Sequence, residues 1–293
     1  MFRGVGTAII TPFTSDYEID YEALKRFLDF QLEGGIQAVV VLGTTGEAPA
    51  VEFDEREALI KAVVEQTRAF DGEIPVIVGT GSNNTKKVIK ANRQAEESGA
   101  DGLLIVTPYY NKSNQEGLYQ HYRFIAGRTA LPIIMYNVPS RTGCNMLPET
   151  VARLADDCPN IVAMKEASGD ISQIARLAAI KPDGMKLYSG NDDQALPVIA
   201  LGGDGVISVF SNVNPGAMNR LAGAALENDY DTARKLQREH LKIMGLMFSD
   251  VNPIPVKYAV SQKGYCEDVL RLPLVTASDK VKKMIDEAFE ETE

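Results

Sequence analysis

The sequence has few of the residues that bind metals or form disulfides. Of 293 residues only three are cysteines, Cys144, Cys158 and Cys266, and only two are histidines, His121 and His240. The cysteines are odd in number, widely spaced and without a CxxC pair, which is typical of a reducing cytoplasm. Neither histidine belongs to an HExxH motif or a Cys/His cluster, so we expect no metal ion.

The sequence also lacks a basic stripe and a long apolar run. Its net charge is −10, whereas a protein that binds nucleic acid regardless of sequence needs clustered Lys and Arg to displace counterions. No apolar run approaches the roughly 18 to 20 residues of a membrane span, and no signal peptide is visible at the start. We therefore expect a cytoplasmic protein with neither a nucleic-acid nor a membrane partner.

Strand-like and helical patterns alternate along the first 227 residues. Eight apolar runs of strand type are expected at 5–10, 38–42, 75–78, 103–106, 133–136, 161–164, 186–188 and 206–209. Each precedes a segment of helical spacing, at 21–32, 54–70, 85–98, 115–128, 148–155, 171–180, 194–201 and 215–226. Short turns between strands and helices imply parallel crossovers, and eight of them close into a (β/α)8 TIM barrel.

A doubly wound sheet is the alternative fold. It is disfavoured because no expected strand is followed by GxGxxG; the nearest run, 79–84, lacks the third glycine. We therefore expect no dinucleotide and, since no metal site is visible either, no cofactor. Beyond the barrel, 1–227, helical patterns at 230–248, 256–262 and 278–291 predict a small C-terminal helical domain, 228–293.

One lysine interrupts the sixth expected strand. Lys165 stands in the run IVAMKEA, 161–167. Lysine is almost never fully buried unless it is paired or used, so Lys165 is either a stem that reaches water at the strand end or a reactive amine. Catalytic residues of such barrels lie at the C-terminal ends of the strands. Hydroxyl groups dominate those ends here, from Thr11, Thr44, Thr45, Thr80, Thr107, Tyr109, Tyr110, Tyr136, Ser189 and Ser208.

A desolvated lysine among hydroxyls can act as a nucleophile. Lowering its pKa from about 10.4 to about 7 or 8 needs roughly 3 to 4 kcal/mol of differential solvation. The neutral amine of Lys165 can then attack a ketone to form a Schiff base. Tyr136 and Thr45 are the candidate proton shuttles, although a packed tyrosine with a wet hydroxyl and a tight turn at 43–47 are the ordinary alternatives.

Two further features suggest a carboxylate substrate. The Gly-Thr-Thr-Gly-Glu run at 43–47 can present a concave set of N–H and O–H donors. Arg141 follows a strand end. Its guanidinium can bind a carboxylate through two parallel hydrogen bonds, or it can form a surface ion pair instead. The turn at 211–214 after the eighth strand has no glycine, so we expect a substrate without phosphate.

Six ordered segments resemble the dihydrodipicolinate synthase family. They are GTTGE at 43–47, TPYYN at 107–111, YNVPSRTG at 136–143, MKEA at 164–167, SGND at 189–192 and GVISV at 205–209, and the likeness extends to LRLPL at 270–274. The family belongs to a superfamily of pyruvate-dependent class I aldolases with N-acetylneuraminate lyase and keto-deoxy-sugar-acid aldolases. The pattern around Arg141 favours the synthase; a sugar-acid aldolase and a barrel that only binds or regulates are the alternatives.

The resemblance implies a lyase reaction of lysine and diaminopimelate biosynthesis. Lys165 is expected to form an imine with pyruvate, whose enamine attacks L-aspartate 4-semialdehyde; the amine of that substrate then displaces the lysine as the ring closes to (4S)-4-hydroxy-2,3,4,5-tetrahydrodipicolinate. The resemblance assigns the proton relay to Tyr136, Thr45 and Tyr110, with Tyr110 supplied by a neighbouring subunit. It therefore implies a homo-oligomer, a tetramer built as a dimer of dimers or a dimer.

The resemblance also assigns the binding groups. Thr44 and Thr45 are expected to hold the carboxylate of pyruvate, and Arg141 that of the semialdehyde. Gly190 and Ile207 are expected to contribute backbone carbonyls to the pocket.

Feedback by L-lysine is not expected. Inhibited members of the family bind lysine at a subunit interface among imidazole and carboxylate groups, whereas the matching positions here are Phe53, Arg56 and Lys87. Two cations facing a cationic ligand cost about 1 to 4 kcal/mol per close pair near a surface. The resemblance therefore predicts little or no inhibition.

Overall fold

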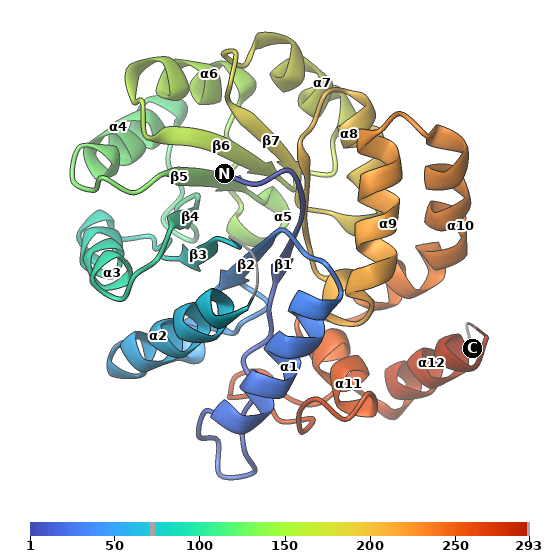
Figure 1. The fold of residues 1–293 in the computed structure, drawn as a ribbon. Helices are drawn as coiled ribbons and strands as arrows, with labels where there is room; N and C mark the ends of the chain where they lie inside the picture. The colour runs from blue at the N-terminus through green and yellow to red at the C-terminus, as the bar shows by residue number, and fades with distance from the viewer. Residues whose placement is uncertain (71–73, 292–293) are drawn as a thin grey trace.

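The chain forms a closed barrel of eight parallel strands in a computed structural model that describes residues 1–70 and 74–291 (Figure 1). The strands follow one another around the barrel, and β8 pairs with β1 to close it. This confirms the predicted (β/α)8 TIM barrel over a doubly wound sheet. The strands are β1 Gly4–Ala8, β2 Ala38–Val41, β3 Val76–Gly79, β4 Gly102–Val106, β5 Ile133–Asn137, β6 Ile161–Glu166, β7 Lys186–Ser189 and β8 Gly205–Ser208.

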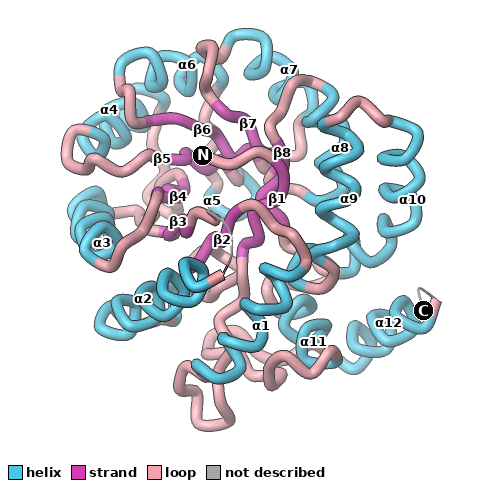
Figure 2. Tube along the Cα trace, in the orientation of Figure 1, coloured by secondary structure: helices cyan, strands magenta, loops and turns pink. Residues whose placement is uncertain are grey.

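A ring of helices surrounds the strands (Figure 2). Several begin at polar caps: the side chain of Asp20 accepts the backbone N–H of Ala23 at the start of α1, and Asn214 accepts that of Ala217 at the start of α9. The helices of the ring are α1 Tyr21–Glu33, α2 Phe53–Ala69, α3 Thr85–Glu97, α4 Gln115–Ala126, α6 Pro148–Asp157, α7 Ile171–Ile180, α8 Ala195–Ala200 and α9 Pro215–Leu226.

Four short helical elements lie in the loops that follow strands. The sequence does not predict them, because three or four residues are too few to show an apolar period. The elements are the 3₁₀ turns η1 Ala48–Ala50, η2 Asp192–Gln194 and η3 Phe210–Asn212, and the helix α5 Pro139–Thr142. All four therefore follow the C-terminal ends of strands, where catalytic residues of such barrels lie.

Three helices follow the barrel: α10 Tyr230–Leu246, α11 Ile254–Gln262 and α12 Asp279–Glu290. In Figure 1 they form the orange and red end of the chain, and α10 packs on α9 while α11 contacts η3. Because these helices contact the barrel, the boundary between 1–227 and 228–293 stays a prediction. No helix within 1–70 or 74–291 is long and apolar enough to cross a membrane.

Strand alternation places Lys165 inside the barrel. Ala163 belongs to the apolar core within the barrel, while Met164 belongs to the outer core between strands and helices. Side chains alternate along a strand, so Lys165 points inward and Glu166 outward. Glu166 accordingly accepts hydrogen bonds from Asn137 and from the backbone of Ser168 outside the barrel interior.

Aromatic rings close the N-terminal end of the barrel. The rings of Phe2 and Tyr188 stack with centroids 4.4 Å apart, and the Tyr188 hydroxyl donates to the Phe2 carbonyl at 2.7 Å. Both side chains are buried. The barrel interior is therefore filled at this end.

Candidate active site

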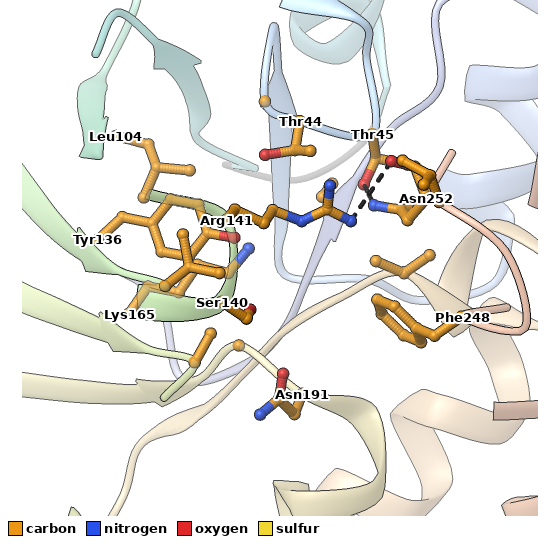
Figure 3. A pocket seen from close by; sticks show the side chains of 17 residues that line it. Thr44, Thr45, Leu104, Tyr136, Ser140, Arg141, Lys165, Asn191, Phe248 and Asn252 are labelled. Atoms are coloured by element: carbon orange, nitrogen blue, oxygen red, sulfur yellow. Dashed lines mark hydrogen bonds between the residues drawn. The ribbon is translucent and has the colours of Figure 1, made fainter. Parts of the chain in front are cut away.

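A cavity of about 300 Å³ lies at the C-terminal ends of the strands (Figure 3). The side chains drawn in Figure 3 converge on it from β5, β6, the loop after β2 and the segment between α10 and α11. Six of the eight residues that we predicted for the site line it, namely Thr44, Thr45, Tyr136, Arg141, Lys165 and Gly190.

Lys165 is buried in the wall of this cavity. Its side chain is 5% exposed, and its Nζ lies 4.3 Å from the centroid of the Tyr136 ring. Burial lowers the pKa of Lys165 to about 8, Arg141 adds to the lowering, and the carboxylate of Asp192 opposes it. About a tenth of the amine is therefore uncharged at pH 7, and this neutral form is the nucleophile.

Gly190 lets the lysine stem pass. A Cβ at position 190 would lie 2.6 Å from the Cβ of Ala167 and 3.1 Å from the Cε of Lys165. The first distance is too short for an added carbon atom, and the second would force the lysine stem to shift. The glycine therefore keeps space for the reactive side chain.

Tyr136 is next to Lys165 across the sheet. The two residues are paired in register between β5 and β6, so both point into the barrel. Burial raises the pKa of Tyr136, against smaller lowering effects of Arg141 and of a hydrogen-bonding interaction with the Thr44 side chain. The phenol therefore keeps its proton at neutral pH and can donate it.

Thr45 is engaged elsewhere. Its side chain is 2% exposed, and its Oγ1 accepts a hydrogen bond of 3.1 Å from the Nδ2 of Asn252. Thr44 is thus the threonine that influences the pKa of Tyr136, while the hydrogen bond of Thr45 is with Asn252. The predicted relay role of Thr45 stays a prediction.

Arg141 lies at the rim of the cavity in α5. Pro139 begins a single helical turn, which Gly143 ends at a φ of 65°. The guanidinium donates through Nη2 to the backbone carbonyl of Asn252 at 3.4 Å. Arg141 forms no ion pair within the part of the chain that the structure describes, so its fork remains available to a carboxylate ligand.

Two predicted residues lie away from the cavity. Tyr110 is 90% exposed with a φ of 70°, a strained conformation for a residue other than glycine. Ile207 is fully buried in β8, within the apolar core of the barrel. Neither lines the cavity of its own chain.

Two features of the site were not predicted from the sequence: the charge of Asp192 near Lys165, and the contribution of the segment after α10 to the cavity wall. Asp192 is 2% exposed; its Oδ2 accepts the backbone N–H groups of Val209 and Phe210 at 3.1 and 2.9 Å, and its charge raises the pKa of Lys165. Its position in the SGND segment was the available signal. Phe248 and Asn252 line the cavity too, but nothing local in the sequence relates them to Lys165.

Among the described residues, no group of three or more His, Cys, Asp or Glu side chains could hold a metal ion.

Comparison with known proteins gives one family. A sequence model of the Dihydrodipicolinate synthetase family matches residues 1–292. The 4-hydroxy-tetrahydrodipicolinate synthase of Thermotoga neapolitana is 52% identical over 295 residues, covering 100% of this chain and 99% of the relative. The dihydrodipicolinate synthase structure from Thermotoga maritima superposes with a TM-score of 0.97 at 49% identity, covering 100% and 99%. A monomeric dihydrodipicolinate synthase variant gives 0.97 at 48% identity, covering 99% and 97%.

Proposed function

This chain belongs to the dihydrodipicolinate synthetase family, and we propose that Lys165 carries its reaction as an imine-forming nucleophile. The reaction is the condensation of pyruvate with L-aspartate 4-semialdehyde, a lyase step of lysine and diaminopimelate biosynthesis. The observation that supports the role of Lys165 is its burial beside Tyr136 in a cavity, with a pKa of about 8. A sugar-acid aldolase is not favoured, because the relative at 52% identity is a synthase.

The first half of the reaction makes a nucleophile from pyruvate. The neutral amine of Lys165 adds to C2 of pyruvate, and the resulting carbinolamine loses its oxygen as water once a proton reaches that oxygen. Tyr136 is placed to supply this proton. For its partner in the relay we favour Thr44, whose side chain affects the pKa of Tyr136, over Thr45, which the sequence had suggested. Loss of a proton from C3 of the iminium then gives the enamine.

The second half joins the carbon atoms and releases the enzyme. The enamine carbon attacks the aldehyde carbon of the semialdehyde, whose oxygen takes a proton and becomes the hydroxyl of the product. The amine of the same substrate then adds to C2, and Lys165 leaves as the free amine when the ring closes. Each turnover thus restores the buried lysine.

The carboxylates of the substrates require separate partners. We assign the pyruvate carboxylate to Thr44 and Thr45, which line the cavity beside Lys165, and that of the semialdehyde to Arg141 at the rim. A guanidinium can donate two parallel hydrogen bonds to a carboxylate. Gly190 and Ile207 remain candidates for backbone contacts with bound substrate.

Borohydride reduction in the presence of pyruvate tests the role of Lys165. We expect a reduced pyruvate adduct on the peptide that contains Lys165, and none without pyruvate. The rate of adduct formation should fall as the pH drops below about 8, because protonation removes the nucleophile; at pH 6 only about 1% of the amine is neutral. An adduct on another lysine, such as Lys257, or no adduct at all would contradict the proposal.

We further propose that the chain acts as a cytoplasmic homo-oligomer, a tetramer built as a dimer of dimers. Tyr110 supports this assembly because its exposed, strained conformation projects the phenol away from its own chain. A phenol of that kind can complete the relay of a neighbouring subunit. One solved relative is described as a monomeric variant, so family membership alone does not set the assembly.

We expect half-inhibition by L-lysine to require more than about 1 mM, since like charges repel. Phe53, Arg56 and Lys87 line a second cavity of about 690 Å³, which also borders Thr44. Arg56 is held there by hydrogen bonds to the carbonyls of Ala48 and Val51, at 2.7 and 3.1 Å. Initial rates at rising L-lysine hydrochloride, with NaCl of equal concentration as the control, will test this; half-inhibition below that concentration specific to lysine would refute it.

A further inference from the structure

Asn252 contacts two residues that bind different substrates in the proposed function, Thr45 for pyruvate and Arg141 for the semialdehyde. Its side-chain Nδ2 donates to the Oγ1 of Thr45 at 3.1 Å, and its backbone carbonyl accepts from Nη2 of Arg141 at 3.4 Å. Asn252 is 4% exposed and lines the cavity (Figure 3). One residue of the C-terminal part of the chain therefore contacts both carboxylate-binding groups of the barrel.

The contact with Thr45 uses a lone pair of the threonine hydroxyl and leaves its proton unused. A hydroxyl has one proton to donate and two lone pairs that accept. When Thr45 accepts from the amide of Asn252, its own proton is free to be donated to a carboxylate in the cavity. An acceptor in place of that amide would compete with the carboxylate for the same proton.

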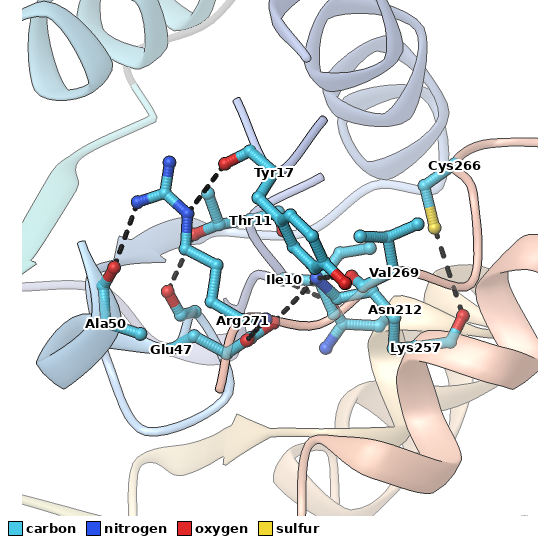
Figure 4. A network of polar contacts seen from close by, with 11 residues as sticks. Ile10, Thr11, Tyr17, Glu47, Ala50, Asn212, Lys257, Cys266, Val269 and Arg271 are labelled. Carbon is cyan, nitrogen blue, oxygen red and sulfur yellow. Dashed lines mark hydrogen bonds and ion pairs between the residues drawn. The ribbon is translucent and has the colours of Figure 1, made fainter. Parts of the chain in front are cut away.

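A buried ion pair between Lys257 and Glu47, shown in Figure 4, lies close in sequence to both ends of this contact. The Nζ of Lys257, in α11, lies 2.6 Å from Oε1 of Glu47, and both side chains are 0% exposed. Glu47 follows Thr45 by two residues, and Asn252 lies two residues before the start of α11. The backbones that carry Thr45 and Asn252 are therefore each close in sequence to a residue of this buried ion pair.

We propose that Asn252 is a positioning residue, which aligns Thr45 through its side chain and Arg141 through its main chain. The inference rests on the proposed function, because it takes Thr45 as a ligand of pyruvate. It predicts that a change of the Asn252 side chain affects KM for pyruvate more than KM for the semialdehyde. A change of the side chain removes the contact with Thr45 but leaves the backbone carbonyl that contacts Arg141.

The test is Asn252→Asp, which replaces the donor by an acceptor. We expect KM for pyruvate to rise about tenfold or more, as for a lost hydrogen bond to a charged group, while KM for the semialdehyde changes less than about twofold. Asn252→Ala, which removes the amide without adding charge, repeats the comparison if the first variant does not fold. An equal change in both KM values, or no change in KM for pyruvate, would overturn the proposal.

A double-mutant cycle shows whether Asn252 acts through Thr45. In a Thr45→Val background no hydroxyl remains to be aligned, so Asn252→Asp should change KM for pyruvate by less than about twofold; independent effects would multiply instead and contradict the proposal. Asn92→Asp, at a buried asparagine of α3 outside the cavity, is the control for general loss of stability. Borohydride trapping on the native chain separates the two proposals, since an adduct on Lys165 without the unequal KM change refutes only the positioning role.

Discussion

A Lys165→Met variant is expected to condense pyruvate with L-aspartate 4-semialdehyde at least about 10³-fold more slowly than the native chain. Methionine has a similar length and no amine, so neither the imine nor the enamine can form. The fold should persist, because an apolar side chain replaces a buried one whose charged form is disfavoured by burial. The measurement is kcat at saturating substrates, with circular dichroism to confirm that the barrel is intact.

Two variants make this result specific. Lys165→Arg keeps a cation of similar reach that stays protonated, so it should be as inactive as the methionine variant. Lys186→Met is the matched control: Lys186 is also a strand lysine, but it pairs with Asp204 at 2.8 Å and its side chain is 36% exposed. The control should retain nearly full activity. A methionine variant at position 165 with more than a tenth of the native kcat would rule out imine catalysis by this residue.

The strands were predictable because parallel strands covered on both faces are continuous apolar runs. The sixth strand shows where that signal ends. Our prediction stopped at Met164, since Lys165 and Glu166 interrupt the apolar run, yet β6 continues through both residues in register with Tyr136 and Asn137 of β5. Backbone pairing thus extends past the apolar pattern at the position where the strand presents its reactive side chain.

The sequence shows two lysines in apolar surroundings, and the partner that distinguishes them is visible only in the structure. Lys257 stands in IPVKYAV much as Lys165 stands in IVAMKEA. Lys257 donates to the backbone carbonyl of Thr11 at 2.6 Å and is paired with Glu47, whereas Lys165 borders a cavity. Burial lowers the pKa of both. What separates a structural lysine from a nucleophile here is the presence of a carboxylate in direct contact, and that partner is remote in sequence.

Removing Lys257 should therefore affect stability more than any change of a surface ion pair. A Lys257→Met variant leaves the carboxylate of Glu47 buried without a counterion, which we expect to lower the free energy of unfolding by about 3 to 5 kcal/mol. Urea denaturation at 25 °C will measure it. Lys61→Met is the control, because Lys61 pairs with Glu57 at 2.7 Å but both side chains are about half exposed; its loss should leave the free energy of unfolding nearly unchanged.

Adding Glu47→Gln to Lys257→Met removes the uncompensated charge, so the double variant should recover part of the lost stability. Recovery should be incomplete, because the carbonyls of Thr11 and Val269 still lose the donor Nζ, which lies 2.6 and 3.0 Å from them. Glutamine keeps an acceptor for the backbone N–H of Arg271, which Glu47 now binds at 3.0 Å. A double variant no more stable than Lys257→Met would mean that packing of α11, and not the buried charge, sets the cost. Because Glu47 follows Thr45 by two residues, we expect the loss of this ion pair to displace the threonines at the cavity as well.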